Sequence, residues 1–176
     1  MNRASLIQQL RAYSTQYDEE RLFIDRFLSL LQSPDCFQRT HLPGHITGSA
    51  WIVTEDKTQA LLVHHAKLNR WLQPGGHADG DENVLTVARK EAEEETGLKN
   101  LRLVRDAIFD LDIHRIPERK DFPAHDHYDI RFLFVADPAE KITVSEESHD
   151  VRWIRLSELE TYNSERAVIR LREKLF

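Results

Sequence analysis

The sequence predicts an α/β fold in which a mixed sheet lies between helices. Segments with strand-like alternation and segments with helical spacing follow one another without the regular strand–helix–strand order of a wholly parallel sheet. The chain has 176 residues, of which 40% are apolar, so it is long enough to bury a core as one globular domain.

Two amphipathic helices are predicted before the first strand. The first covers residues 4–14, and the second begins near Thr15 or Asp18 and stops before Pro34. Both carry apolar residues on one side. We expect this helical pair to pack on or beside its own sheet, and a dimer arm is the alternative.

Strand-like segments occupy the middle of the chain, and polar turns separate several of them. The strands are predicted at residues 45–53, 60–65, 101–116, 128–136 and 151–156. Two helical segments follow the last strand, at residues 157–159 and 163–175. Strands and helices thus mix without a regular strand–helix–strand alternation, which predicts a mixed sheet between helices.

Composition and charge exclude several classes of protein. The net charge of −6 and a pI near 5.8 argue against binding to nucleic acid through phosphate attraction. No apolar run reaches the length of a membrane span, so no membrane partner is expected. The single cysteine, Cys36, cannot form an intramolecular disulfide, and we expect a cytoplasmic protein. A small phosphorylated ligand stays compatible with the acidic charge, because a bound cation reverses the local sign.

The segment from Gly76 to Leu98 carries the strongest chemical signal. Glu91, Glu94 and Glu95 stand at i, i+3 and i+4, so a helix places the three carboxylates on one face. Like charges at this spacing destabilise a helix unless a cation binds them. Hard divalent ions that choose oxygen ligands, above all Mg²⁺, fit this arrangement.

A solvated, glutamate-rich surface helix with no site is the alternative interpretation. Three features favour a site instead. Glycines precede the helix, Asp81 or Asn83 can cap its start, and Gly97 stands where a left-handed residue ends it. An apolar stripe along the same helix predicts that its other face packs on the core.

The segment resembles the signature of the Nudix hydrolases. That signature reads Gly, five residues, Glu, seven residues, Arg-Glu, an apolar or small residue, any residue, Glu-Glu, any residue, Gly, apolar. The matching positions are Gly76, Glu82, Glu91, Ala92, Glu94, Glu95, Gly97 and Leu98. Lys90 stands where the family has arginine. The resemblance implies a Nudix-type α/β/α sandwich over residues 36–176, with a helical extension over residues 1–35.

The resemblance also implies an activity. Nudix hydrolases are metal-dependent enzymes, so we expect a pyrophosphohydrolase that cleaves a pyrophosphate bond in a nucleoside diphosphate linked to another moiety, or in a related nucleotide. The attack on phosphorus would come from water activated by Mg²⁺, with Mn²⁺ as the alternative ion. The expected partner is a small nucleotide or another pyrophosphate, and the protein would be a monomer or a homodimer.

The family pattern implies roles for individual residues. The metal ligands would be Glu91, Glu94, Glu95 and a carbonyl oxygen of Gly75 or Gly76. Glu94 would be a third ligand or would orient the water. Lys90 would keep the positive charge of the family's arginine without its two-pronged geometry, and it is also a candidate substrate contact.

The general base is expected in the acidic segment before the last strand. Nudix enzymes often carry a functional glutamate there, so Glu146 and Glu147 are the catalytic candidates. An exposed acidic turn is an equally good interpretation of the same segment.

Histidines and one tryptophan are the candidate substrate contacts. His77 follows the glycines directly, and Trp71 could stack on a base, although an aromatic residue on a strand more often belongs to the core. His125, His127 and Asp129 alternate, so an extended strand would place them on one side. We expect His125 and His127 to contact substrate, and a transition-metal site or a solvated strand edge are the alternatives.

Two other functions compete with hydrolysis. A ligand-sensing Nudix module without catalysis usually loses the glutamates that are kept here. An enzyme like isopentenyl diphosphate isomerase would need a catalytic cysteine, and Cys36 lies before the first predicted strand.

Overall fold

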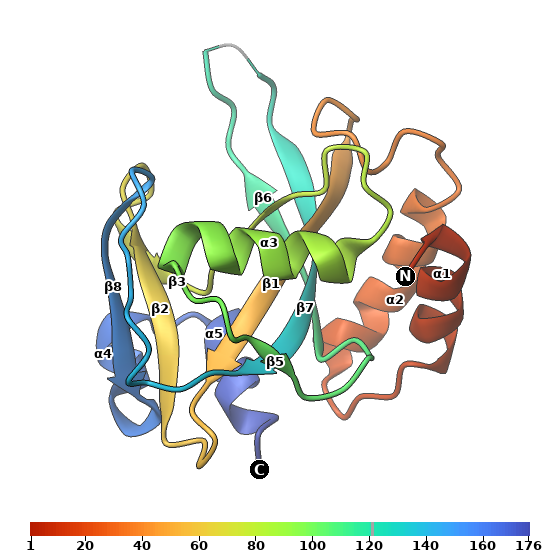
Figure 1. The fold of residues 1–176 in the computed structure, drawn as a ribbon. Helices are drawn as coiled ribbons and strands as arrows, with labels where there is room; N and C mark the ends of the chain where they lie inside the picture. The colour runs from red at the N-terminus through yellow and green to blue at the C-terminus, as the bar shows by residue number, and fades with distance from the viewer. Residues whose placement is uncertain (121) are drawn as a thin grey trace. The chain divides into compact units, whose positions relative to one another are not determined.

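A computed structural model describes residues 1–120 and 122–176 and shows a mixed α/β fold, which confirms the predicted fold class (Figure 1). The chain forms two compact units. The first comprises residues 1–48, 76–88 and 107–132, and the second comprises residues 49–75, 89–106 and 133–176. Three of the elements that continue from one unit into the other are β1 (Gly44–Val53), α3 (Val84–Thr96) and β7 (His125–Val135).

The first unit contains the two N-terminal helices. α1 (Arg3–Ala12) begins with a capping box between Asn2 and Ser5, and α2 (Asp18–Leu30) has three acidic residues in its first turn. The two helices lie side by side, and α2 also contacts β6 (Asp110–Ile116) (Figure 1). β6 pairs with β7 in antiparallel register from Asp110↔Arg131 to Ile116↔His125.

A buried ionic network lies on the paired strands β6 and β7. The guanidinium of Arg131 contacts Asp129 at 2.8 Å and both Asp110 and Asp112 at 3.1 Å, and all four side chains are buried. Burial by itself lowers the pKa of Arg131, but the three carboxylates outweigh burial and raise it. Thr47 on β1 donates a hydrogen bond to Asp129 at 3.1 Å, so the network joins three strands of the first unit.

The second unit contains the strand order β3–β2–β1–β7–β5. β2 (Gln59–His65) pairs with β3 (Arg70–Leu72) and along its length with β8 (Ser148–Arg155), in both cases antiparallel. A short strand, β4 (Gly75–His77), pairs with β1. The remaining elements are β5 (Arg102–Leu103), the 3-10 helix η1 (Leu156–Glu158), α4 (Leu159–Tyr162) and α5 (Arg166–Glu173).

The prediction of one long strand over residues 101–116 is wrong. The segment forms two strands, β5 and β6, which pair with different parts of β7. Leu103 pairs with Phe134, and Asp110 pairs with Arg131. The two pairs are seven residues apart on this segment but three apart on β7, so four residues of the segment loop out. The loop carries the exposed Val104 and polar residues, which interrupt the apolar alternation.

None of the helices in the described residues is long and apolar enough to cross a bilayer. The proposed division into an extension, residues 1–35, and a domain, residues 36–176, stays a prediction.

The Arg131 network makes a testable statement about stability. Arg131→Met leaves three buried carboxylates without their cation, so we expect the free energy of unfolding to fall by about 3–5 kcal/mol. Urea denaturation followed by circular dichroism measures this. The control is Arg115→Met, because Arg115 bonds Asp126 at 3.1 Å with its own side chain 58% exposed. Its loss should change the free energy of unfolding by less than about 1 kcal/mol. Equal stability of both variants would contradict the role given to Arg131.

Candidate active site

The start of α3 is fixed within the first unit. Asn83 Oδ1 accepts a hydrogen bond from the backbone N–H of Thr86 at 3.3 Å, so Asn83, one of the two predicted residues, caps the helix. Asp81 accepts from the backbone N–H of Asn83 at 2.8 Å and orders the turn before it. These two side chains satisfy donors that a helix start otherwise leaves open.

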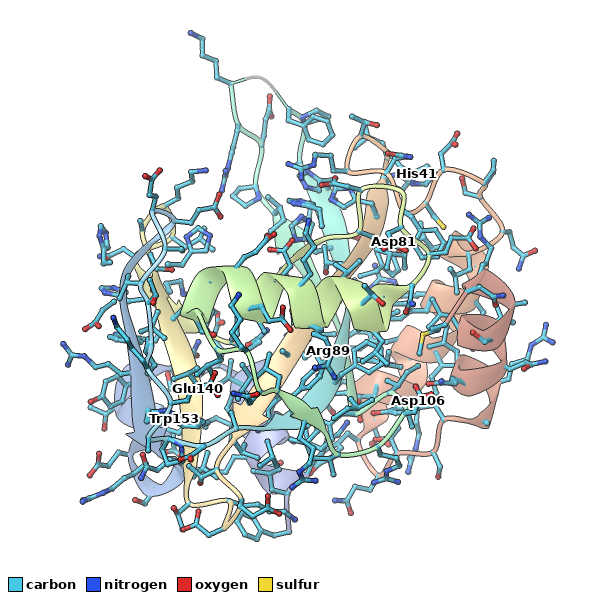
Figure 2. The ribbon with its side chains drawn as sticks, viewed as in Figure 1. His41, Asp81, Arg89, Asp106, Glu140 and Trp153 are labelled. Atoms are coloured by element: carbon cyan, nitrogen blue, oxygen red, sulfur yellow. The ribbon has the colours of Figure 1, made fainter. Side chains whose placement is uncertain are left out.

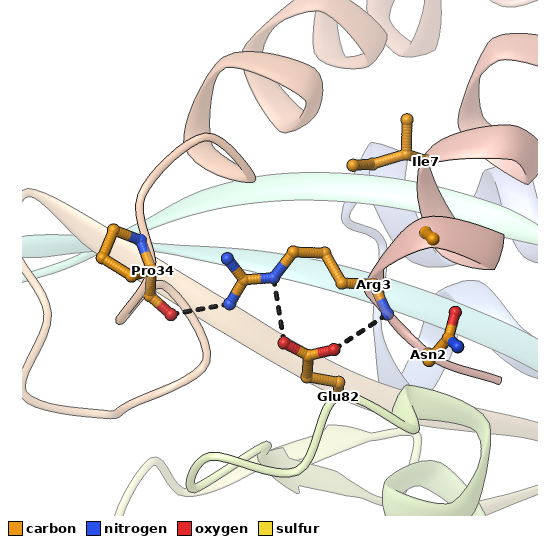
Figure 3. Close-up of a pocket in the computed structure, with 6 residues that line it drawn as sticks. Asn2, Arg3, Ile7, Pro34 and Glu82 are labelled. Atoms are coloured by element: carbon orange, nitrogen blue, oxygen red, sulfur yellow. Dashed lines mark hydrogen bonds and ion pairs between the residues drawn. The ribbon is translucent and has the colours of Figure 1, made fainter.

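Glu82 is anchored to the N-terminal helix. Its carboxylate forms an ion pair with Nε of Arg3 at 3.0 Å and accepts from the backbone N–H of Arg3 at 3.1 Å (Figure 3). Arg3 also donates to the carbonyl oxygen of Pro34 at 2.6 Å. A surface pocket of about 600 Å³ surrounds this contact and is lined by Asn2, Arg3, Ala4, Ile7, Pro34 and Glu82. In this position Glu82 joins segments of the first unit and stabilises the start of α3.

Glu95 is the most perturbed carboxylate of the predicted site. It is 9% exposed, and its pKa is raised to about 8 by burial and by the neighbouring carboxylates Glu91, Glu147 and Glu94. The backbone N–H of Gly75 donates a hydrogen bond to Glu95, which offsets part of this rise. The structure therefore brings together, within the second unit, the three predicted helix carboxylates and one of the two predicted loop glutamates.

Gly75 has to be glycine where it lies. A Cβ added there would be 2.2 Å from Oγ of Ser49 and 2.8 Å from its Cα, well inside contact distance. The missing side chain lets the strand that contains Gly75 approach β1 and places its N–H on Glu95. At the other end of α3, Gly97 has φ +77° and meets the expectation of a left-handed residue there.

Lys90 pairs with Glu94. Its Nζ lies 3.6 Å from a Glu94 carboxylate oxygen, and both side chains are more than half exposed, so the pair contributes little to stability. The neighbouring Arg89, labelled in Figure 2, donates to the carbonyl oxygen of Leu101 at 2.6 Å and lies over the ring of Phe134. Arg89 is thus used for packing, and Lys90 is the cation beside the carboxylates of α3.

The two loop glutamates are not equivalent. Glu147 influences the pKa of Glu95, and its backbone carbonyl accepts from the N–H of Ala66, which holds the loop at the end of β2. Both side chains are exposed, and Glu146 is not among the main groups that shift the pKa of Glu95. This electrostatic effect on Glu95 favours Glu147 over Glu146, two candidates that the sequence left equal.

Trp71 lies in an aromatic cluster of the second unit. The ring of His64 stacks on it at a centroid distance of 4.9 Å, and Tyr162 meets it edge-on at 5.6 Å. The guanidinium of Arg152 lies 5.7 Å from the centre of the Trp71 ring. Sequence reasoning missed His64, Arg152 and Tyr162, which come from three separate segments.

A second cluster, of histidines, lies in the first unit. The ring centroid of His45 lies 5.2 Å from that of His77 and 4.9 Å from that of His127. Burial lowers the pKa of His45 to about 4 and of His127 to about 2, and the pKa of His77 is lowered as well. Sequence reasoning missed His45, and the only available signal was its place at the start of a predicted strand. Whether His77, His125 and His127 contact substrate stays a prediction.

Asp129 belongs to the ionic network and not to the histidine cluster. Its two carboxylate oxygens bond Arg131 and Thr47, and its side chain is 2% exposed. The predicted row on one side of β7 thus divides into a histidine end, His125 and His127, and an acidic residue that is neutralised by Arg131.

Comparison with known proteins identifies the family. Residues 44–173 match the family model described as the NUDIX domain. The chain belongs to the Nudix hydrolase family, as predicted. Enzymes of this family generally use divalent metals, which agrees with the acidic helix.

Two curated relatives of this Nudix chain are hydrolases. It is 28% identical over 139 residues to a probable DHNTP pyrophosphohydrolase of Lactococcus lactis, with 77% of this chain and 80% of that protein covered. It is 32% identical over 119 residues to a CMP-5'-(N-acetyl-N-hydroxy-3-aminopropyl)phosphonate hydrolase of Streptomyces rubellomurinus, with 63% of this chain covered and about half, 52%, of that protein.

Solved structures share the fold. A Caenorhabditis elegans Ap4A hydrolase binary complex superimposes with a TM-score of 0.60 at 18% identity, covering 74% of this chain and 93% of that one. A MutT protein from Methanosarcina mazei gives a TM-score of 0.60 at 21% identity, covering 75% and 92%. At these identities the likeness shows the Nudix fold alone.

The raised pKa of Glu95 predicts how the metal-free Nudix protein responds to pH. A carboxylate whose pKa is about 8 in the folded state and about 4.5 when unfolded favours folding below the lower value, and this contribution is lost as pH rises through the higher one. The melting temperature of wild type should therefore fall, relative to Glu95→Gln, between about pH 4.5 and 8. Differential scanning calorimetry in a chelator measures it. Parallel pH profiles for the two proteins would contradict the assignment.

Proposed function

We propose that this protein is a divalent-metal-dependent pyrophosphohydrolase whose metal ligands are Glu91, Glu94 and Glu95, with a carbonyl oxygen of Gly75 or Gly76. The main support for this proposal is that Glu95 is buried next to three other carboxylates. Burying a negative charge beside like charges is unfavourable unless a cation joins them. The donors are all hard oxygens, and such donors fit Mg²⁺, or Mn²⁺, better than softer ions.

The chain's own residues supply position and charge. The Gly75 N–H donates a hydrogen bond to the Glu95 carboxylate, and the exposed Lys90 ammonium supplies positive charge beside Glu94. Glu147 is the preferred base for the attacking water, because it is the loop glutamate that acts on Glu95, and Glu146 is the weaker candidate. A bound divalent ion would lower the pKa of water and neutralise charge on the phosphate oxygens.

The substrate class follows from the relatives and from the acidic site. The two curated relatives are named for a pterin triphosphate and for a CMP-linked phosphonate, and both names describe phosphorylated small molecules. We infer a nucleoside diphosphate linked to another group, or a related nucleotide such as a triphosphate, as substrate. Trp71 is the candidate surface for a base, and His77, His125, His127 and Lys90 are the candidate phosphate contacts.

The competing functions receive no support. An isomerase chemistry would need an accessible cysteine, but Cys36 is fully buried and burial raises its pKa, which keeps the thiol protonated. A sensor without catalysis would not need three carboxylates around a buried fourth.

A panel of nucleotide pyrophosphates tests the proposal. Sugar nucleotides, dinucleotides, CDP-alcohols and nucleoside triphosphates are incubated with Mg²⁺ or Mn²⁺, and the products are separated by chromatography. Cleavage of a phosphate–phosphate bond that stops in excess chelator supports the proposal. Metal-independent cleavage, or no cleavage of any member, would count against it.

The metal ligands make a quantitative prediction. Glu95→Gln keeps the shape of the side chain but removes its charge, so kcat/KM at saturating Mg²⁺ should fall by about 100-fold or more. Glu93→Gln is the matched control, because Glu93 lies on the same helix and is not among the main groups that shift the pKa of Glu95. Its kcat/KM should change by less than about 3-fold. A Glu95→Gln enzyme with wild-type turnover would remove Glu95 from the ligand set.

Lys90, which stands where the family has arginine, leads to a second prediction. If Lys90 only holds Glu94, Lys90→Arg should keep or improve kcat/KM, and Lys90→Ala should lower it with little effect on the melting temperature. Steady-state kinetics beside a thermal melt measure both. A folded but inactive Lys90→Arg enzyme would show that the ammonium contacts substrate directly.

A further inference from the structure

Three imidazole rings of the first unit lie against one another, and their ligand atoms form a compact triangle. The rings belong to His45, His77 and His127, and one ring nitrogen from each lies within 4.8 Å of the others. The centroid of His77 is 5.0 Å from that of His127, so each ring contacts the other two. The residues come from β1, β4 and β7, so the strand pairing and not the local sequence brings them together.

His45, a member of this triangle, has a buried ring nitrogen without a hydrogen-bond partner among the described residues. Its Nδ1 lies 3.3 Å from the carbonyl oxygen of His41, which is labelled in Figure 2, and because a carbonyl only accepts, Nδ1 carries the proton. Nε2 therefore keeps its lone pair. His45 is 1% exposed, and its Nε2 has no hydrogen-bond partner among the residues that the structure describes. A buried acceptor of this kind is unfavourable unless something binds it.

We propose that His45, His77 and His127 bind a transition-metal ion of the Zn²⁺ class through three imidazole nitrogens. Imidazole suits Zn²⁺, Cu²⁺ and Ni²⁺, whereas Mg²⁺ takes oxygen ligands, so this site differs in chemistry from the carboxylates of α3. A tetrahedral ion with nitrogen ligands at about 2.0–2.1 Å keeps them about 3.3 Å apart, so the rings need to draw together by no more than about 1.5 Å.

His125 lies outside this triangle but next to His127, and it is the candidate fourth ligand. Its Nδ1 bonds the carbonyl oxygen of Pro123 at 2.9 Å, so its Nε2 also keeps a lone pair. This Nε2 lies 3.3 Å from Nε2 of His127, and two ring nitrogens at that distance need a proton or a cation between them. A carbonyl partner on the other ring nitrogen, as His45 and His125 both have, is the usual way in which a metal-binding histidine is oriented.

The burial that lowers the pKa of His45 and His127 supports the same site, because a neutral imidazole is the form that binds a metal. None of the ligands belongs to the carboxylate set, so the inference does not depend on the hydrolytic chemistry proposed above. For His77, His125 and His127 it is an alternative to the phosphate contacts, because a ring nitrogen that binds a metal cannot also contact phosphate. An ion there would join three strands of the first unit and would stabilise the folded state.

The experiment separates the histidine site from the carboxylates. The full chain with Glu91→Gln and Glu95→Gln is stripped with a chelator and titrated with Co²⁺ alone, then with Zn²⁺ alone. We expect one equivalent to bind, the visible absorption of Co²⁺ with nitrogen ligands, and a higher melting temperature. Adding His77→Gln, at a half-buried position, should weaken binding by more than the roughly 10- to 100-fold that loss of a ligand's orienting partner costs. His149→Gln is the control, because His149 is exposed and lies in the second unit, and it should leave the affinity unchanged.

A measurement on the wild-type chain guards against misfolded variants. In ¹⁵N nuclear magnetic resonance spectra, zinc should change the chemical shifts of the imidazole nitrogens of His45, His77 and His127. The chemical shifts of the His149 nitrogens should stay unchanged. Each of three outcomes would overturn the proposal. The double glutamine variant binds no ion, His77→Gln does not weaken the affinity for the ion, or zinc leaves the imidazole signals unchanged.

Discussion

Buried charge has to be balanced where it lies, and this requirement shapes both units of the chain. In the first unit, Arg131 meets three buried aspartates and joins β6 to β7, while Thr47 connects β1 to the same group. The residues of this network alternate along the two strands with those that face the other side. In the second unit, Glu95 is buried among further carboxylates and its pKa rises to about 8. The first arrangement is neutralised within the protein, whereas in the second the charge is relieved by a proton or, as proposed above, by a divalent cation.

The sequence predicted the acidic helix well because every signal there is local. The cap at Asn83, the carboxylates at helical spacing and the left-handed Gly97 depend on neighbours within a turn or two. The Arg131 network could not be predicted in the same way. Asp110, Asp112 and Asp129 lie on strands, where a hydropathy pattern assigns charged residues to solvent, yet all three are buried. The burial of Asp110 and Asp112 depends on Arg131, which is 21 and 19 residues away in the sequence.

The long strand that the sequence suggested fails for a related reason. Alternation over residues 101–116 is a local property, but whether a segment stays in register depends on the strand beside it. β7 pairs with Leu103 and with Asp110 at positions too close together to accommodate all the residues between them, so the chain loops out. The polar residues after Val104 interrupt the alternation, but the number of residues that loop out is set by the pairing with β7.

The two sets of donors differ in the ions that they select. Carboxylate oxygens take Mg²⁺ and Mn²⁺, whereas neutral imidazoles take Zn²⁺ and its neighbours, and the Irving–Williams order places the latter well above Mn²⁺ in affinity for nitrogen. Mg²⁺ would therefore leave the histidines alone, but a transition metal added to the protein would sample both sets. Activity measured with Co²⁺ or Zn²⁺ would combine any direct effect at the carboxylates with stabilisation of the first unit through the histidines. The dependence on Mg²⁺ is consequently the cleaner measure of the carboxylate chemistry.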